Sequence, residues 1–567
     1  MAKKKREPIR EIRNFKELLE IYKGYGENTV FKYKKKGEIQ SISYNQFVED
    51  IKALGTALLD LGVTKVAVIG NNRYEWCTTY LAVTTAGLVV VPLDKALTDK
   101  EIERLVKRSG AEAIVYDSKY QNAVDEVEKD SNLKYKICMD NTEKEGVLKY
   151  EEILKKGKEL RKKNSKEYDT VKIDPKKMSV MLFTSGTTNE PKAVMLSQSN
   201  LCSQMNNIPK SVKLYETDTL LSFLPIHHTF ECTITFLYGT YSGCTIAFCE
   251  GLKYIAQNLK DYKVTVFVAV PLVLETMYKK IQKGIEESGK KGLIDAMGKV
   301  SSALLKCHID LRKVLFKPVL KQFDEHLRVV LYGAAPMDKK TILGYNSLGI
   351  ELVQGYGLTE SSPVISAETD ERKRPGSVGL PINGVKVKID NPDQEGIGEI
   401  LAKGPNIMLG YYENEEATRK ALDKDGWLHT GDYGYIDEEG FIYITGRKSD
   451  LIVLRNGKNV YPQEIEFLIN KLAYVDESLV YSRDKSKTDT LLGAKIVYNK
   501  DIIKEKFGDK TEKEYQDLIW KDIKEINEEL PTYKHIKEIT ITDEPLEKTT
   551  TQKVKRFVEI QKIETSN

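Results

Sequence analysis

Threonine, serine, glycine and lysine residues lie close together at residues 184–192, which read TSGTTNEPK and follow the apolar run KMSVMLF. An apolar run of this length predicts a strand, so the polar residues begin where that strand ends. Glycine permits a tight turn, in which amides and hydroxyls converge on an anion while a lysine adds positive charge. This chemistry favours phosphate, and an ordinary polar turn is the alternative. The candidate phosphate-binding residues are Thr184, Ser185, Gly186, Thr187, Thr188 and Lys192.

A second stretch, GIEESGKK at residues 284–291, resembles the spacing of a P-loop. A P-loop ends in Ser or Thr and follows a strand, whereas this stretch ends in Lys291 and follows a helical pattern. We interpret it as a surface turn between helices. A P-loop NTPase remains an alternative, and its products would be ADP and phosphate instead of AMP and pyrophosphate.

Five further motifs follow the first cluster in order: YGAAP, VQGYGLTE, LHTGD, GFIYITGRKSD and PLEKTTTQKVKR. In this order and spacing they resemble the adenylate-forming superfamily, which includes acyl-CoA synthetases, luciferases and nonribosomal adenylation domains. The resemblance covers nearly the whole chain. The segment LPIHHTFE at 224–231 is similar to the long-chain fatty acyl-CoA synthetase branch.

The resemblance implies a role for each matching position. Thr184 and Glu360 would contact Mg²⁺, and Lys553 would bridge the carboxylate and the α-phosphate. His228 would lie near the acyl carboxylate, while we interpret His227 as a bystander. Lys553, Glu360, Thr184 and His228 are thus the candidate catalytic residues. The remaining positions would bind ATP: the loop 184–192 at the β- and γ-phosphates, Tyr356 on adenine with Gly333 and Ala334 lining the pocket, Thr359 at the α-phosphate, and Asp432 and Arg447 on the ribose. Gly357 is also a candidate ATP-binding residue.

Five positions depart from the family pattern. Asn189 and Ala193 stand where relatives usually carry glycine, and Gln198 stands where many carry histidine. Gln552 replaces the usual glycine before the terminal lysine, and Ser449 occupies a hinge position that is often Asp or Lys. None of these changes removes a charged candidate group, so the enzyme interpretation is kept.

The surrounding elements predict an α/β fold. Helical patterns alternate with apolar strands in the first third, which is typical of parallel or mixed sheets covered by helices. The predicted strands after the first third of the sequence are followed by polar residues at their carboxyl ends, where ligands of such sheets bind. After about residue 440 the pattern becomes that of a small α+β module. We predict an N-terminal domain at 1–446 that binds ATP and the acyl substrate, and a mobile C-terminal domain at 447–567.

Composition limits the partners. The 567 residues carry a formal net charge of only +4, which gives no general attraction to nucleic acid. Seven scattered cysteines without a CxxC pair favour a reducing, cytoplasmic setting. The basic start MAKKKREPIREIR lacks a following apolar stretch, so we predict no signal peptide. Peripheral contact of this basic segment with an anionic membrane is one hypothesis, and a solvated tail is the other.

These observations lead to one functional hypothesis. The chain is predicted to be an AMP-forming ligase that uses ATP, Mg²⁺ and CoA to convert a fatty acid, with long chains favoured, into its CoA ester. The predicted partners are these small molecules, and the oligomeric state is not predicted. A fatty acyl-AMP ligase that loads a carrier protein and a non-catalytic relative that only binds acyl or nucleotide ligands are the alternatives.

Overall fold

The computed structural model describes residues 10–127, 131–163, 166–184, 191–287, 289, 292, 296–298, 300–301, 309–317, 320, 326–369, 371–455, 458–486, 489–548 and 554–565. The chain forms two compact units, one of residues 1–387 and 402–428, the other of residues 388–401 and 429–567.

The first unit contains two large sheets. The eight-stranded sheet has the order β19-β9-β8-β4-β3-β5-β6-β7, in which the strands from β8 to β7 are parallel and β9 and β19 are antiparallel. Its strands are β3 (Lys65–Ile69), β4 (Val89–Pro92), β5 (Ala113–Tyr116), β6 (Tyr135–Cys138), β7 (Val147–Lys149), β8 (Met178–Thr184), β9 (Lys192–Ser197) and β19 (Gly410–Tyr411).

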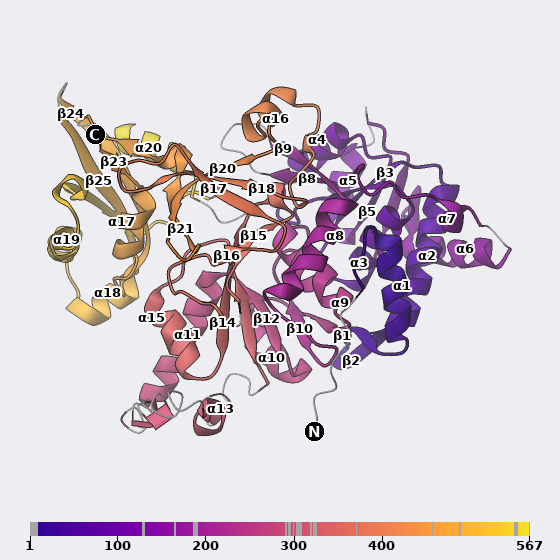
Figure 1. Cartoon of the computed structure of the whole chain (residues 1–567), viewed down its shortest axis with the longest axis horizontal. Helices are drawn as coiled ribbons and strands as arrows, with labels where there is room; N and C mark the ends of the chain where they lie inside the picture. Colours follow the sequence, from indigo (N-terminus) through magenta and orange to yellow (C-terminus); the bar gives the residue numbers. More distant parts are fainter. Residues whose placement is uncertain are drawn as a thin grey trace. The chain divides into compact units, whose positions relative to one another are not determined.

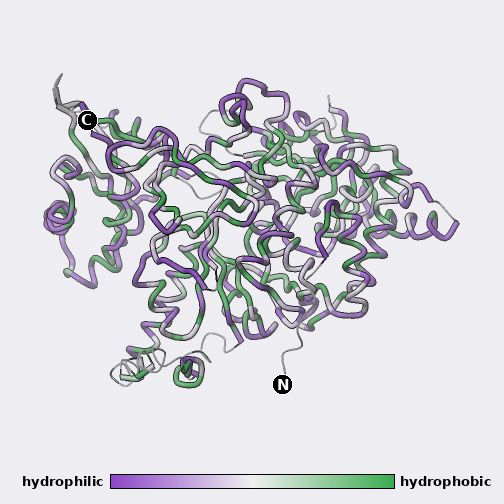
Figure 2. The backbone as a smooth tube through the Cα atoms, in the orientation of Figure 1, coloured by the Kyte–Doolittle hydropathy of each residue, from purple (hydrophilic) through white to green (hydrophobic). Residues whose placement is uncertain are grey.

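The nine-stranded sheet has the order β16-β15-β14-β13-β12-β10-β11-β1-β2, parallel from β14 to β1 and antiparallel at both edges. Its strands are β1 (Thr29–Lys35), β2 (Glu38–Ser43), β10 (Thr219–Ser222), β11 (Thr245–Phe248), β12 (Val266–Ala269), β13 (Val329–Tyr332), β14 (Glu351–Gly357), β15 (Val364–Ala367) and β16 (Leu380–Pro381). The central strands β5, β10, β12 and β13 are hydrophobic and fully buried (Figure 2), as burial on two faces requires.

Helices cover both faces of each sheet (Figure 1). Helices α4 and α5 pack on one face of the eight-stranded sheet, and α10, α11 and α15 pack on the outer face of the nine-stranded sheet. Between the sheets, α3 contacts β3 and β4, α8 contacts β8, and the π-helix η3 (Glu231–Tyr238) contacts β10 and β12. The helices of this unit are α1 (Phe15–Tyr25), α2 (Tyr44–Asp60), α3 (Tyr74–Thr85), α4 (Asp99–Ser109), α5 (Gln121–Val127), α6 (Tyr150–Lys162), α7 (Glu167–Thr170), α8 (Gln198–Asn207), α9 (Gly239–Tyr241), α10 (Ile255–Tyr262), α11 (Pro271–Glu287), α13 (Arg312–Leu315), α15 (Lys339–Ser347) and α16 (Glu415–Ala421).

The second unit is built on smaller sheets. Strands β17, β18, β20 and β21 form one sheet, β22 and β23 form a two-stranded ladder, and β24, β25 and β26 form a third. The core of the C-terminal part is apolar and includes Val460, Ile465, Ile496 and Ile519. The elements are β17 (Lys386–Asp390), β18 (Gly398–Lys403), β20 (Leu428–Ile436), β21 (Ile442–Arg447), β22 (Ile452–Val453), β23 (Asn459–Val460), β24 (Val475–Ser486), β25 (Asp489–Tyr498), β26 (Glu538–Thr542), α17 (Pro462–Ile469), α18 (Lys500–Phe507), α19 (Glu512–Glu528) and α20 (Arg556–Thr565).

The predicted fold class, an α/β chain with a smaller α+β part, is confirmed. The compact units divide the chain earlier than residue 446, because strands β17, β18 and β20 pair in one sheet with β21. A domain boundary at 446/447 therefore stays a prediction. The P-loop-like stretch begins inside helix α11, since residues 284–287 are helical. Among the described residues, no helix is both long enough and apolar enough to span a membrane.

Candidate functional site

The β8–β9 hairpin brings the two described ends of the hydroxyl-rich loop together. Thr184 is the last residue of β8 and pairs with Lys192, the first residue of β9. The Thr184 hydroxyl donates to the Lys192 carbonyl at 3.4 Å. Arg108 of helix α4 donates to the Pro191 carbonyl at 2.7 Å, which fixes the loop's exit. Ser185, Gly186, Thr187 and Thr188 lie outside the described residues, as does Lys553.

Glu360 lies in a short 3₁₀ turn, Thr359–Ser361, directly after strand β14. Two buried side-chain amides hold this turn. Asn406 donates to the Ser361 carbonyl at 3.0 Å and to the Val364 carbonyl at 2.9 Å, and Gln204 donates to the same Val364 carbonyl at 3.0 Å. Because these partners are buried, the turn that carries Thr359 and Glu360 has little freedom to move.

Tyr411 joins the two segments. Its hydroxyl donates to the Glu360 carboxylate at 2.9 Å, and the Lys192 ammonium lies 5.1 Å from the centre of its ring. Burial and the neighbouring Glu360 charge raise the pKa of Tyr411, so the phenol stays protonated. Lys192 and Glu360, which are far apart in the sequence, thus both contact one tyrosine, and Thr184 lies beside Lys192 in the strand ladder. None of the sequence motifs includes Tyr411. Only the structure shows its position, on strand β19 beside β9.

The ends of β13 and β14 form a second part of the candidate site. An added Cβ at Gly333 would lie 2.7 Å from the Gly355 carbonyl oxygen, so the two strand ends approach closely there. Ala334 follows in a left-handed backbone conformation with φ of 72° and is exposed. Tyr356 is buried, with 9% of its surface exposed. Gly333 and Ala334 follow β13 and Tyr356 lies on β14, and these two strands pair in parallel. The predicted adenine-binding role of these residues stays a prediction.

Gly357→Ala is expected to destabilise the first unit by about 1–3 kcal/mol, because overpacking forces the backbone to shift. An alanine Cβ at 357 would lie 1.7 Å from the Pro363 carbonyl oxygen. Gly355→Ala is the matched control, since its Cβ would meet only the Ser366 carbonyl at 3.7 Å. Urea denaturation without ligands measures both variants, and equal midpoints would contradict this prediction.

The predicted ribose contacts lie in the second compact unit. Asp432 and Arg447 face each other on β20 and β21, with Arg447 Nε 2.9 Å from Asp432 Oδ1. The Asp432 side chain is buried, with 6% exposed. Nearby, Glu399 accepts from Lys448 at 2.7 Å and lies 3.1 Å from His429. Burial opposes the charge of Glu399, but Lys448 and His429 lower its pKa overall. The proposed ribose-binding roles stay predictions.

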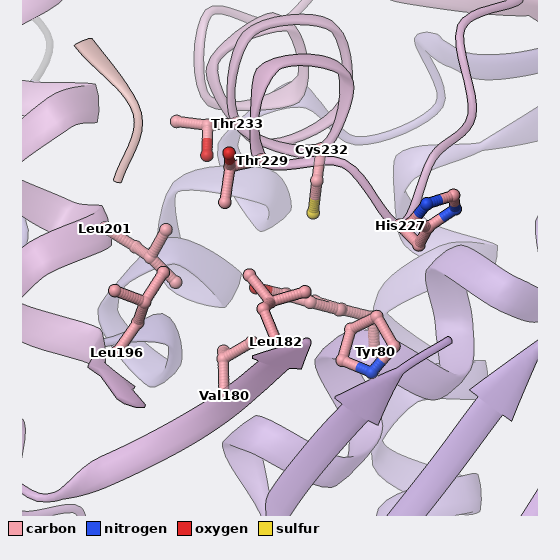
Figure 3. Close-up of a pocket in the computed structure, with 10 residues that line it drawn as sticks. Tyr80, Val180, Leu182, Leu196, Leu201, His227, Thr229, Cys232 and Thr233 are labelled. Carbon is pink, nitrogen blue, oxygen red and sulfur yellow. The ribbon is translucent and has the colours of Figure 1, made fainter. Parts of the chain in front are cut away.

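A narrow apolar cavity lies between the sheets, beside the predicted acyl-carboxylate residue. Its volume is about 10 Å³, close to the space that one water needs. Figure 3 shows Thr229, Cys232 and Thr233 on one side and Val180 and Leu182 of β8 on the other. His227 lines the cavity, and its ring centroid is 4.1 Å from that of His228.

The sequence interpretation named His228 and set His227 aside, yet His227 is the histidine that borders the cavity. His227 Nε2 lies 3.5 Å from Asp94 Oδ1, just after strand β4. Burial, helped by His228 and Lys95, lowers the pKa of His227 well below its ordinary value. His227 is therefore neutral near pH 7 and can accept or donate a hydrogen bond within an apolar site.

Glu231, at the start of η3, is fully buried. Burial raises its pKa to about 8, against hydrogen bonds from Ser222 and Thr235 and the charge of Lys95. A folded-state pKa above the ordinary value of 4.5 means that the native state keeps a proton which the unfolded chain has released. Stability therefore falls as pH rises between these two values.

Wild-type stability is expected to fall by roughly 1.4 kcal/mol per pH unit between about pH 5 and pH 8, relative to Glu231→Gln. The glutamine variant cannot titrate at this position, so it lacks this contribution. Urea denaturation of both proteins at pH 5, 6, 7 and 8 measures the difference. Parallel stability profiles would show that Glu231 keeps an ordinary pKa.

Two helix-covered parallel sheets with polar residues at their strand ends, followed by a separate α+β unit, form the architecture of adenylate-forming acyl ligases. The chain belongs to the AMP-binding enzyme family: the family model of that description matches residues 20–412, and the model of the AMP-binding enzyme C-terminal domain matches residues 449–564.

Curated relatives are similar over most of the chain. The long-chain-fatty-acid–CoA ligase ACSBG1 of Homo sapiens is 30% identical over 84% of this chain and 70% of its own length. The chloroplastic long-chain-fatty-acid–[acyl-carrier-protein] ligase AEE15 of Arabidopsis thaliana is 27% identical over 89% of this chain and 78% of its own length.

Solved structures share the fold. The anthranilate CoA ligase AuaEII in complex with anthranoyl-AMP aligns over 99% of this chain and 98% of its own, with a TM-score of 0.76 and 19% identity. ATP-bound MatB from Rhodopseudomonas palustris aligns over 96% and 98%, with a TM-score of 0.75 and 22% identity.

Proposed function

We propose that this chain is an ATP-dependent acyl-CoA synthetase that activates a long-chain fatty acid through an acyl-adenylate and transfers it to CoA. The observation that carries the proposal is the contact of Tyr411 with both Lys192 and Glu360, together with the pairing of Lys192 with Thr184, in a chain of the AMP-binding family. The choice of a fatty acid and CoA is supported by relatives whose names state these substrates.

In the first step, a carboxylate oxygen of the acid forms a bond to the α-phosphorus of ATP. The bond from that phosphorus to the bridging oxygen breaks, and pyrophosphate leaves. Negative charges approach each other, so groups that oppose this charge accelerate the step. Lys192 supplies a fixed ammonium beside the described ends of the loop, and Lys553 is proposed to supply a second one.

The oxygen donors of this group suit magnesium. Glu360 offers a carboxylate and Thr184 a hydroxyl, which are the hard ligands that Mg²⁺ prefers, usually alongside water and phosphate oxygens. Bound there, the ion would neutralise phosphate charge. Tyr411 donates to Glu360 and so orients its carboxylate, as partners of metal ligands commonly do.

In the second step, the CoA sulfur attacks the carbonyl carbon of the acyl-adenylate. The carbon–oxygen bond to AMP breaks, the thiol proton passes to solvent, and the CoA ester and AMP are released. We propose that the C-terminal part rotates about residues 447–450 between the steps, so that Lys553 serves only the first.

The acyl chain is proposed to enter the cavity between the sheets. At about 10 Å³ the cavity is too small for an alkyl chain in this conformation, so its apolar walls must separate on binding. Each buried methylene then contributes about 0.8 kcal/mol, roughly fourfold in affinity, which favours long chains.

The test is CoA- and ATP-dependent turnover of acids from acetate to palmitate, with AMP and pyrophosphate as products. Rising kcat/KM with chain length supports the proposal. A flat response, or turnover of aryl acids alone, would exclude the fatty-acid assignment, and ADP as the product would exclude adenylation.

A second candidate function is acyl transfer to a carrier protein, which the similarity to the Arabidopsis ligase favours. Acid-dependent exchange of pyrophosphate into ATP without formation of a CoA ester would identify it. Tight ATP binding without AMP formation would instead indicate a non-catalytic relative. Cytoplasmic location and peripheral membrane contact stay predictions.

A further inference from the structure

The loop between β10 and η3, residues 223–230, carries His227 and His228 and is held by polar side chains at its start, middle and end. Ser222 precedes the loop, and Glu231 follows it. The Ser222 hydroxyl donates to Glu231 Oε1 at 2.7 Å, which ties the two ends of the loop together. Glu231 and Ser222 expose 0% and 1% of their surfaces.

Asn72 fixes the middle of this loop from the other sheet. Asn72 follows strand β3 of the eight-stranded sheet, whereas the loop follows β10 of the nine-stranded sheet. Its amide nitrogen donates to the Leu224 carbonyl at 2.7 Å, and its amide oxygen accepts from the Ile226 backbone at 3.2 Å. The same nitrogen donates to the Ser222 hydroxyl at 2.9 Å.

These contacts form one directed chain of hydrogen bonds. Asn72 donates to Ser222, Ser222 donates to Glu231 Oε1, and Thr235 donates to Glu231 Oε2 at 2.9 Å. We call Asn72, Ser222, Glu231 and Thr235 the loop network. Each bond in such a chain polarises the next, so removing one member weakens the others.

Stability alone does not explain a buried acid at this position. A carboxyl group removed from water carries a desolvation cost that an apolar residue of similar size would avoid. Glu231 also begins a π-helix, a rare geometry that is frequently found at functional sites. Cys232 and Thr233, the next two residues, line the cavity.

We propose that Asn72 and Glu231 are positioning residues for acyl binding: the loop network holds the His227–His228 loop at the mouth of the cavity, in the orientation that receives the acyl carboxylate. The inference rests on the proposed function, because it places a fatty acid in this cavity. Neither residue needs to touch the acid, since both act on the backbone and ends of the loop.

The experiment measures binding of palmitate and of ATP separately, by calorimetry, with the full chain. Glu231→Leu removes both acceptors, and Asn72→Ala removes the contacts to the middle of the loop. Each variant is expected to weaken palmitate binding about tenfold or more, because it loses one or two buried hydrogen bonds. The affinity for ATP is expected to change less than about twofold. Glu231→Gln, which keeps an amide oxygen for Ser222, is expected to recover most of the affinity.

Thr265→Val is the matched control. Thr265 precedes β12 and donates to Asp218, which precedes β10, at 2.7 Å. The His227–His228 loop follows the other end of β10, so this variant loses a comparable hydrogen bond away from the loop. It should leave palmitate affinity unchanged. Since the two network positions are coupled, the double variant Asn72→Ala, Glu231→Leu is expected to lose less affinity than the sum of the single losses.

Equal weakening of palmitate and ATP binding would overturn the inference, as would unchanged palmitate affinity in folded Glu231→Leu and Asn72→Ala. If the wild-type protein binds palmitate but forms no AMP, the proposed function is wrong. The palmitate affinities of the variants then still test the role of the loop network. A wild-type chain that binds no palmitate overturns both.

Discussion

Replacing Glu360 by alanine is expected to lower the rate of AMP formation by at least about 100-fold, the effect of losing one preorganised charged group at a phosphoryl-transfer site. Glu360 is held by the 3₁₀ turn and accepts from Tyr411, so its carboxylate is oriented before any ligand binds. If Glu360 binds magnesium as proposed, its loss should also raise the magnesium concentration needed for half-maximal adenylation, because one anionic ligand is removed. Pyrophosphate release, measured over a magnesium series, gives both values.

Two control variants separate this role from general effects. Tyr411→Phe keeps the Glu360 charge and removes only the hydrogen bond of 2.9 Å, so a smaller loss of about 10-fold is expected. Glu415→Ala removes an exposed carboxylate on α16 that pairs with Arg419 and should have no effect. If the magnesium dependence of Glu360→Ala matches that of the wild type, Glu360 is not a metal ligand.

Lys553→Ala is expected to reduce formation of the acyl-adenylate by about 10²–10³-fold and to leave the second step intact. An ammonium group that bridges the carboxylate and the α-phosphate opposes charge only while those groups react. Conversion of supplied acyl-adenylate and CoA into the CoA ester should therefore continue at the wild-type rate. The two half-reactions are measured separately, by pyrophosphate release and by CoA-ester formation.

Lys555→Ala is the matched control for this variant. Lys555 is close by in the sequence, but its ammonium pairs with Glu547 at 2.9 Å on the surface of the C-terminal part. Removing it should leave both half-reactions unchanged. Normal acyl-adenylate formation by Lys553→Ala would show that the role assigned to Lys553 is wrong.

Much of the first unit could be predicted because its signals are local. Continuous apolar runs coincide with β3, β4, β5, β10, β12 and β13, and Glu101 accepts from the Thr98 backbone N–H at 2.9 Å at the start of α4. The pairing of strands was less accessible. β8 pairs in parallel with β4 but in antiparallel with β9, and only the antiparallel pairing brings Thr184 and Lys192 opposite each other.

The candidate site shows the same division. Motif order predicted that Thr184, Lys192 and Glu360 share one site, but it did not predict that Tyr411 contacts Lys192 and Glu360, because Tyr411 lies in a two-residue strand with no motif of its own. Similarly, the sequence shows the adjacent histidines His227 and His228, but which of their rings borders the cavity depends on the conformation of the loop after β10. The roles of Asp432, Arg447 and Lys553 stay predictions.

The sequence by itself determined the family, the order of the elements and the chemical groups available, because each is written in residue types and spacings along the chain. The tertiary structure alone decided that Tyr411 links Lys192 to Glu360, and that Asn72 of one sheet holds a loop of the other. Such contacts join residues more than 50 positions apart, and they form only when strands pack side by side. Local patterns report burial and periodicity, but they do not specify which distant backbone a side chain will meet.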